Sequence, residues 1–144
     1  MNIVEATDAY EAWMARHTSI VQDDIEKKHK LIAKSPFVFL RGTFYRWVQI
    51  WPTICASLAD APTVLAVGDL HVENFGTYLS SQGRLVFDVN DFDETYLGHF
   101  TWDLMRFAAS LALTGWQKAL PEADVRRLIG RYVRSYLRQI NHYL

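Results

Sequence analysis

The sequence contains little cysteine, little excess charge and no long hydrophobic run, and each scarcity excludes a class of protein. Cys55 is the only cysteine, so the chain can form neither an internal disulfide nor a zinc site built from several cysteines, and a cytoplasmic location is expected. The formal net charge is −1, which predicts no nucleic-acid partner. No apolar run approaches the roughly 20 residues that span a bilayer. Residues 1–15 lack the apolar core of a signal peptide, so no membrane partner is expected either.

What the chain does contain predicts a folded domain of the α+β class that is mostly helical. Half of the 144 residues are hydrophobic and 14% are aromatic, which is enough apolar material for a packed core. We expect one domain over residues 1–144 with three parts. These parts are an N-terminal helical part (1–59), a part with a strand, two loops and a hairpin (60–100), and a pair of C-terminal helices (101–144).

In the N-terminal part, apolar periodicity predicts a continuous helix over residues 5–33. Ser35-Pro36 should end it, because the residue before a proline avoids the α region. A short apolar run over 37–40 precedes a turn at Gly42. A second helix is expected over 43–59, with a kink or a break near Trp51 caused by Pro52.

In the middle part, residues 63–67 should form a buried strand, and 75–79 and 84–89 a hairpin closed by the loop 80–83. Residues 90–100 look like an irregular acidic loop. Thr101 is expected to N-cap a helix that is buried on all sides and ends near residue 114. Pro121 suits the first position of the last helix, whose apolar stripe should belong to the core and whose arginines should face solvent.

Two polar motifs flank the predicted hairpin. The first, residues 68–74, reads Gly-Asp-Leu-His-Val-Glu-Asn, and the second, residues 90–93, reads Asn-Asp-Phe-Asp. Kinases place a catalytic carboxylate and an asparagine five positions apart in one loop, and a metal-binding carboxylate beyond a short hairpin. The spacing therefore suggests Asp69 as the base that receives a hydroxyl proton. Asn74 with Asp91 or Asp93 would hold magnesium.

The same motifs are similar to those of aminoglycoside and choline phosphotransferases. Those enzymes usually have His-Gly-Asp-x-His-x-x-Asn, then Asp-Phe-Asp, and about a dozen residues later an Asp-Leu that opens a helix. The chain has Val67 in place of the first histidine, and Asp103-Leu104 as the later pair. The resemblance favours Asp91 as the main metal ligand and Asp93 as an auxiliary one. The choice among Asp88, Asp91 and Asp93 stays open.

Three segments together resemble the domain-of-unknown-function family numbered 2252, which is grouped with the kinase-like fold. They are residues 35–42, 68–76 and 90–94. The resemblance implies the large lobe of a kinase-like phosphotransferase, with Mg²⁺ and ATP as cofactors and a small hydroxyl compound as substrate. It does not identify the substrate or the oligomeric state. Relatives are longer, and the glycine-rich flap and strand lysine of a small lobe are absent, so a partial domain is expected.

Four further residues are expected to support the site or bind substrate: Arg41, His71, Glu73 and Asp88. Arg41 could bind a phosphate, or form a salt bridge with the acidic loop. His71 should bond the first loop through a ring nitrogen. A zinc deaminase signature is incomplete, because Pro-Cys-x-x-Cys is missing. Asp103 should pair with backbone amides or with Arg106.

Three functions remain open from the sequence. The first is Mg-ATP-dependent phosphoryl transfer to a small hydroxyl substrate. The second is phosphoester hydrolysis by a divalent metal held on the same carboxylates. The third is a non-catalytic fragment or binding module, which the missing small lobe motivates. The apolar residues interleaved in the acidic segment (Val86, Phe87, Val89 and Phe92) should draw it toward the core, which favours a metal site over a solvated loop.

Overall fold

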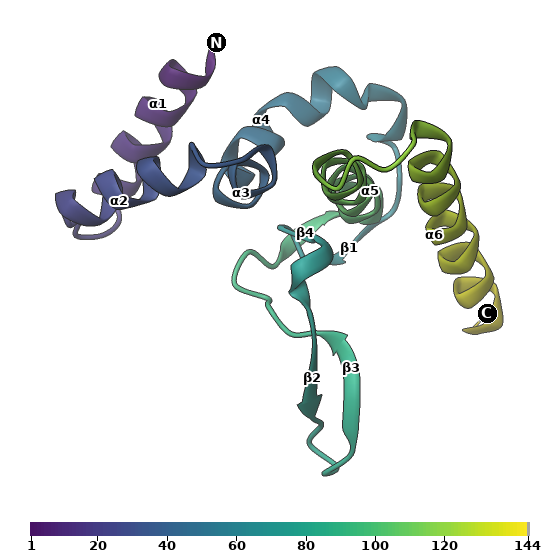
Figure 1. The fold of residues 1–144 in the computed structure, drawn as a ribbon. Helices are drawn as coiled ribbons and strands as arrows, with labels where there is room; N and C mark the ends of the chain where they lie inside the picture. The colour runs from purple at the N-terminus through teal and green to yellow at the C-terminus, as the bar shows by residue number, and fades with distance from the viewer. Residues whose placement is uncertain (144) are drawn as a thin grey trace. The chain divides into compact units, whose positions relative to one another are not determined.

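The computed structural model describes residues 1–143, which contain six α-helices, two short 3₁₀ helices and four β-strands (Figure 1). The predicted α+β class with mostly helical content is confirmed. The chain divides into two compact units, and the second begins at Asp60. This boundary coincides with the end of the N-terminal helical part defined above. The two units are described separately.

The first unit consists of helices alone. They are α1 (Ile3–Ala15), α2 (Gln22–Ile32), α3 (Pro36–Gly42), α4 (Phe44–Ile54) and the 3₁₀ helix η1 (Ala56–Leu58). The prediction of one helix over 5–33 is wrong, because residues 16–21 separate α1 from α2. That segment includes the β-branched residues Thr18, Ile20 and Val21, which are weaker helix formers than the residues on either side.

The short apolar run 37–40 turns out to be helical, since it belongs to α3. The Ser35 hydroxyl accepts a hydrogen bond from the Val38 N–H at 3.2 Å, and Pro36 occupies the first helical turn. Pro52 lies inside α4, and the helix ends two residues later. The core of this unit includes Trp51, which is 1% exposed. Half-buried Tyr10 and Tyr45 stack with ring centroids 4.3 Å apart.

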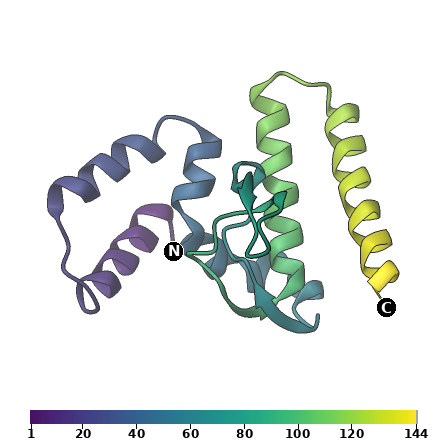
Figure 2. The same cartoon turned by 90° about the horizontal axis from the view of Figure 1, so that it is seen from below.

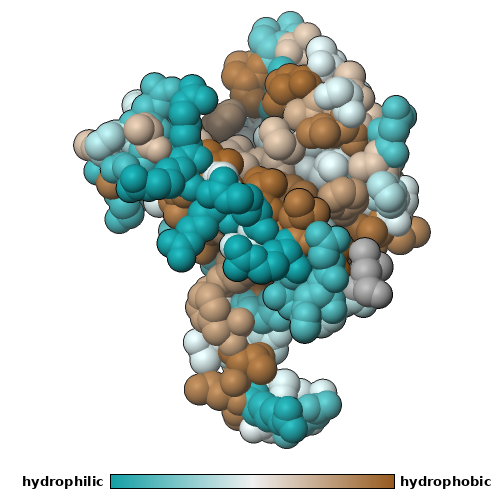
Figure 3. Space-filling model, turned by 90° about the vertical axis from the view of Figure 1, so that its right-hand side faces the viewer, coloured by the Kyte–Doolittle hydropathy of each residue, from teal (hydrophilic) through white to brown (hydrophobic). Residues whose placement is uncertain are grey.

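The second unit contains two small antiparallel sheets. Its strands are β1 (Thr63–Ala66), β2 (Phe75–Leu79), β3 (Leu85–Val89) and β4 (Tyr96–His99), and the short 3₁₀ helix η2 (Val72–Asn74) directly precedes β2. The predicted hairpin is confirmed as β2 paired with β3, and Figure 3 shows apolar surface along it with polar residues at its tip. Strand β4 was not predicted. It pairs with β1, so residues 90–100 are not wholly irregular.

Strand β1 is not the buried strand that its apolar sequence predicted. Only Ala66 is buried, whereas Leu65 is 72% exposed. Leu65 pairs with Leu97 of β4, which is 76% exposed, so the two leucines form a cross-strand pair on an open face of this sheet.

Two long helices complete the second unit, α5 (Phe100–Gln117) and α6 (Glu122–Tyr143), which lie side by side (Figures 1 and 2). The N-cap of α5 is His99 rather than Thr101, because β4 leads directly into the helix. Phe107 and Tyr132 join the helices with ring centroids 4.5 Å apart. The prediction that the apolar stripe of α6 belongs to the core is wrong, because α6 contains no buried residue and Leu137 is 58% exposed.

The buried residues of α5 are not its large apolar ones. They are Thr101, Arg106, Ser110 and Gly115, while Trp116 is 67% exposed. The prediction of a helix buried on every side by apolar residues is therefore wrong. Two of these buried residues, Arg106 and Ser110, contact the loop after β1. Within residues 1–143, no helix is long and apolar enough to cross a membrane.

Candidate functional site

The first polar motif begins with a tight turn that only glycine fits. Gly68 follows β1 with φ +93°, a region that L side chains rarely adopt. A Cβ atom at this position would lie 2.2 Å from the carbonyl oxygen of Glu94. The missing side chain therefore allows the first motif to pack directly against the acidic segment that contains the second.

Two further contacts join the segments where β2 begins and β3 ends. The Asn90 N–H donates to the Asn74 carbonyl oxygen at 2.9 Å, which extends the hairpin pairing by one bond. The Asn90 side chain lies over Gly76, where a Cβ would be 2.2 Å from its Nδ2 atom. The motifs, about 20 positions apart in sequence, are thus held together at both ends.

Between the motifs lies a cavity of about 190 Å³. It is lined by Val67, Asp69, Asn74, Asp91, Asp93 and Glu94. The structure thus gathers the predicted base and all three predicted metal ligands around one space. It also adds Glu94, which brings the number of lining carboxylates to four. Such a concentration of negative charge favours a bound cation or a cationic partner.

Asp69 is held by a buried arginine from α5. The Arg106 Nε donates to Asp69 Oδ1 at 2.6 Å, and its Nη2 contacts the same oxygen. The Arg106 side chain is 1% exposed, whereas that of Asp69 is 18% exposed. Burial lowers the pKa of Arg106, while the Asp69 and Glu94 carboxylates act against that change. The second oxygen, Oδ2, lies 3.9 Å from His71 Nε2.

The turn 71–74 is closed by its own side chains. The His71 N–H donates to Asn74 Oδ1 at 2.6 Å, and the Glu73 N–H donates to His71 Nδ1 at 3.2 Å. His71 and Asn74 are each 3% exposed. His71 thus bonds the loop through a ring nitrogen, and the Nδ1 atom that accepts this bond must be unprotonated.

Helix α5 also binds the backbone of the first motif at two more points. Asp103 accepts hydrogen bonds from the Val67 N–H at 2.7 Å and the Gly68 N–H at 3.0 Å. Burial raises the pKa of Asp103, and these two bonds oppose the change. The Ser110 hydroxyl, about one turn beyond Arg106 on the same helix, accepts from the Val72 N–H at 3.2 Å. Backbone amides, one of the two partners expected for Asp103, are therefore confirmed.

The remaining predicted residues lie around this cavity or outside it. Asp88 is exposed on β3, and its Oδ1 accepts from the adjacent Val89 N–H at 2.7 Å. The Glu73 side chain is exposed at the edge of the turn. Arg41 belongs to α3 in the first unit, and its role stays a prediction. The expected burial of the acidic segment is wrong, because Phe87 is 72% and Phe92 54% exposed.

Sequence reasoning missed the roles of Glu94, Arg106 and Ser110. A signal for two of them exists in α5, where Asp103, Arg106 and Ser110 follow one another at spacings of three and four. This spacing puts three polar side chains on one face of a helix that is otherwise rich in apolar residues. Such a face requires polar partners in the fold, and the loop after β1 provides them.

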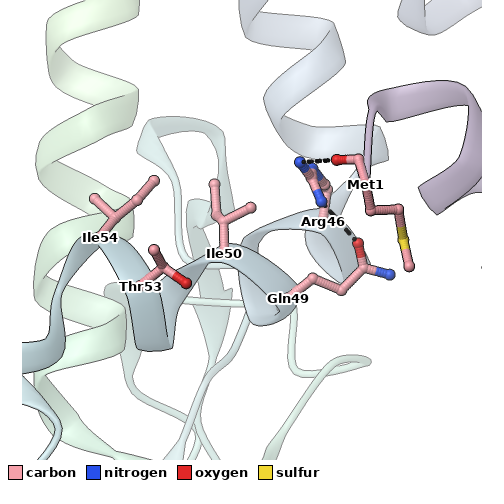
Figure 4. Close-up of a pocket in the computed structure, with 6 residues that line it drawn as sticks. All are labelled: Met1, Arg46, Gln49, Ile50, Thr53 and Ile54. Carbon is pink, nitrogen blue, oxygen red and sulfur yellow. Dashed lines mark hydrogen bonds between the residues drawn. The ribbon is translucent and has the colours of Figure 1, made fainter.

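A second cavity lies in the first unit and contains none of the predicted site residues (Figure 4). It measures about 600 Å³ and is lined by Met1 and residues of α4. Its arginine, Arg46, donates to the Met1 carbonyl oxygen at 3.0 Å and to Gln49 Oε1 at 3.2 Å. The guanidinium is thus used within the unit itself, and nothing else at this cavity indicates a ligand.

The fold and the cavity together define an α+β protein whose acidic site is built from two loops and supported by one helix. The chain belongs to the family described as "Uncharacterized protein conserved in bacteria (DUF2252)", whose model matches residues 20–144. No curated protein and no solved structure matches the chain.

Proposed function

We propose that the chain carries the acceptor-binding and metal-binding loops of an ATP-dependent phosphotransferase that acts on a small hydroxyl compound. One observation carries the proposal. Asp69, Asn74, Asp91 and Asp93, which come from both sides of a hairpin, line a single cavity. Their order along the chain is similar to that of kinase-like phosphotransferases, in which these residue types perform phosphoryl transfer. A resemblance at the level of fold alone would not suffice.

In this proposal the Asp69 carboxylate accepts a hydrogen bond from the acceptor hydroxyl. Arg106 contacts the same carboxylate at Oδ1. A bond forms between the acceptor oxygen and the γ-phosphorus of ATP, the bond from that phosphorus to the β–γ bridging oxygen breaks, and ADP leaves. The hydroxyl proton passes to the Asp69 carboxylate and then to solvent. Much of the rate gain in such reactions comes from positioning and charge stabilisation rather than from covalent chemistry.

The donor atoms of the cavity suit magnesium bound together with phosphates. Carboxylate and amide oxygens are its preferred protein ligands, and magnesium usually takes one or two carboxylates and completes its shell with water and phosphate oxygens. Asp91 and Asp93 supply the carboxylates, and Asn74 Oδ1 has a second lone pair besides the one that accepts from His71. In residues 1–143 no three His, Cys, Asp or Glu side chains are grouped closely enough to hold a metal alone. Bound magnesium would neutralise charge on the β- and γ-phosphates.

The size of the cavity also supports a small acceptor. A volume of about 190 Å³ admits the hydroxyl end of a small molecule. Pockets that bury a whole drug-sized ligand usually measure about 300–1,000 Å³. The sequence has no Gly-x-Gly-x-x-Gly motif, so the proposal concerns the acceptor and the metal rather than the covering of the nucleotide.

ATP turnover tests the proposal. The full chain is incubated with Mg²⁺, ATP and a panel of small alcohols, sugars and amino alcohols, and ADP and free phosphate are measured separately. Formation of ADP without equivalent phosphate, abolished in Asp69→Asn, is expected. Release of phosphate from simple phosphoesters in the absence of nucleotide would support a metal hydrolase instead. A chain that neither turns over nor binds Mg-ATP would be a non-catalytic module.

A further inference from the structure

We infer that one face of the β2–β3 hairpin is the contact surface of a symmetric dimer, in which it packs on the same face of a second copy of the chain. Alternate residues of a strand share a face, and so do residues that are paired across two strands. The residue pairs on this face are Phe75–Val89, Thr77–Phe87 and Leu79–Leu85. We call these six residues the hairpin face.

The inner end of the hairpin face is covered by a helix, and its outer end is exposed. The ring centroids of Phe75 and Phe107 lie 5.4 Å apart, which attaches the base of the hairpin to α5. Further out, Leu79 is 69% exposed, and Leu85 and Phe87 are each 72% exposed. Figure 1 shows the hairpin extending away from α5, and Figure 3 shows the apolar surface along it. A two-stranded hairpin alone is at best marginally stable in water, so this outer part gains stability from a partner surface.

The area of these exposed side chains fits a weak dimer. A large apolar side chain presents about 200 Å² when it is fully exposed, so Leu79, Leu85 and Phe87 together expose roughly 400 Å². Two copies would bury about 800 Å² from these side chains, and about 1,000 Å² with Thr77 and the adjacent backbone. Specific interfaces begin near this total, and the smallest of them are transient. We therefore expect a reversible dimer with a Kd of about 1–100 µM.

The chemistry of the hairpin face suits a second copy of the chain. None of its six residues is charged, and Asp88, the charged residue within the two strands, alternates to the opposite face. A two-fold interface brings a surface against itself, so a charge on it would meet the same charge at a cost. The net charge of −1 adds little repulsion between copies. A strongly acidic or basic partner would find no complementary charge here.

Sedimentation of the full chain without ligand, from about 1 to about 200 µM, tests the inference. The average mass should rise with concentration and approach that of a dimer. Leu85→Glu should raise the dimer Kd at least about 10-fold, because the contact would bury its carboxylate. The matched control is Leu65→Glu, since Leu65 is also 72% exposed but belongs to the β1–β4 sheet, and its Kd should stay within about 2-fold of the wild type. Circular dichroism establishes that each variant is folded, and Phe87→Ser replaces Leu85→Glu if the latter is not.

Three results of this experiment would overturn the inference. A wild type that stays monomeric throughout would show that the hairpin face is covered by something other than a second copy. Equal effects of Leu85→Glu and Leu65→Glu would place the contact elsewhere. A mass that rises past the dimer without a plateau would indicate non-specific apolar association. Because no nucleotide or metal is present, these results are independent of the proposed phosphotransfer.

A mixture of Leu85→Glu and Leu85→Lys tests the symmetry of the contact. In a two-fold dimer the two substituted positions lie within one small interface, where opposite charges attract and like charges repel. The mixture should therefore form a heterodimer whose Kd is at least about 5-fold lower than that of either variant alone. A mixture that associates no better than the separate variants would overturn the symmetric arrangement.

Discussion

Replacement of Gly68 by alanine tests whether direct packing of the two motifs builds the site. The chain offers a matched control in Gly83, at the tip of the hairpin. Both glycines have positive φ, +93° at Gly68 and +71° at Gly83. A Cβ at Gly83 would meet nothing within 4 Å, whereas one at Gly68 would lie 2.2 Å from the Glu94 carbonyl oxygen. The two variants therefore share the cost of placing alanine at positive φ, and only Gly68→Ala adds an overlap between the new Cβ and another atom.

The expected magnitudes follow from these two terms. Alanine in a left-handed conformation costs about 1–2 kcal/mol. A stiffer unfolded chain offsets roughly 0.4–1 kcal/mol of this, so Gly83→Ala should destabilise by about 1 kcal/mol. Gly68→Ala carries the same cost and an overlap with a backbone atom, and overpacking of this kind costs about 1–3 kcal/mol. We expect a total of about 3 kcal/mol for Gly68→Ala.

Urea unfolding of the two variants measures the difference, which should be about 2 kcal/mol. Gly68→Ala should also weaken Mg-ATP binding under conditions in which it is fully folded, because Glu94 and the adjacent Asp93 must move away from Asp69 to admit the new methyl group. Gly83→Ala should bind as the wild type does. If the two variants unfold within about 0.5 kcal/mol of each other, the packing of Gly68 on Glu94 does not hold the site together.

Three further results are expected. Gly76→Ala should destabilise the protein by roughly 1 kcal/mol in urea unfolding, which is less than Gly68→Ala, because the Asn90 side chain that the new Cβ would meet can move. A loss of stability as large as that of Gly68→Ala would contradict this reasoning. Ser110→Ala leaves the Val72 N–H without its acceptor and should lower the free energy of unfolding by about 1–3 kcal/mol. An unchanged free energy of unfolding would contradict the proposed support of the loop by α5. Burial raises the pKa of Asp103 above its usual value of 3.8. Just above pH 3.8, the folded state therefore binds more protons than the unfolded state, and the contribution of Asp103 to the free energy of unfolding falls as pH rises. The unfolding free energy of the wild type minus that of Asp103→Asn should therefore decrease from about pH 4 until the raised pKa is passed, and an increase over that window would refute the assignment.

The sequence predicted well the parts of the fold that depend on neighbouring residues. The hairpin β2–β3 follows from two short apolar runs around a polar loop. Strand β4 was missed because it has four residues and pairs with β1, about 30 positions earlier. Nothing in its own sequence distinguishes it from a loop. The break between α1 and α2 was also missed, because apolar periodicity continues through residues that are poor helix formers.

In the candidate site too, features set by local sequence were predicted and contacts between distant residues were missed. The order and spacing of the motifs suggested that Asp69, Asn74, Asp91 and Asp93 gather in one place, and they line one cavity. The contact of Arg106 with Asp69 joins residues 37 positions apart, and it depends on how α5 docks on the loop. Spacing within α5 indicated a polar face but could not say which loop group each residue binds.

The central claim is that the cavity binds magnesium with ATP, and a calorimetric titration of the full chain tests it most directly. ATP is titrated with and without Mg²⁺ into the wild type, Asp91→Ala and the control Asp60→Ala, which removes an exposed carboxylate from a turn outside the cavity. The account predicts magnesium-dependent binding to the wild type and to Asp60→Ala. It also predicts a loss of about 10-fold or more in Asp91→Ala, equivalent to about 1.4 kcal/mol. Absence of magnesium-dependent binding in the wild type, or equal affinity in Asp91→Ala, would contradict it.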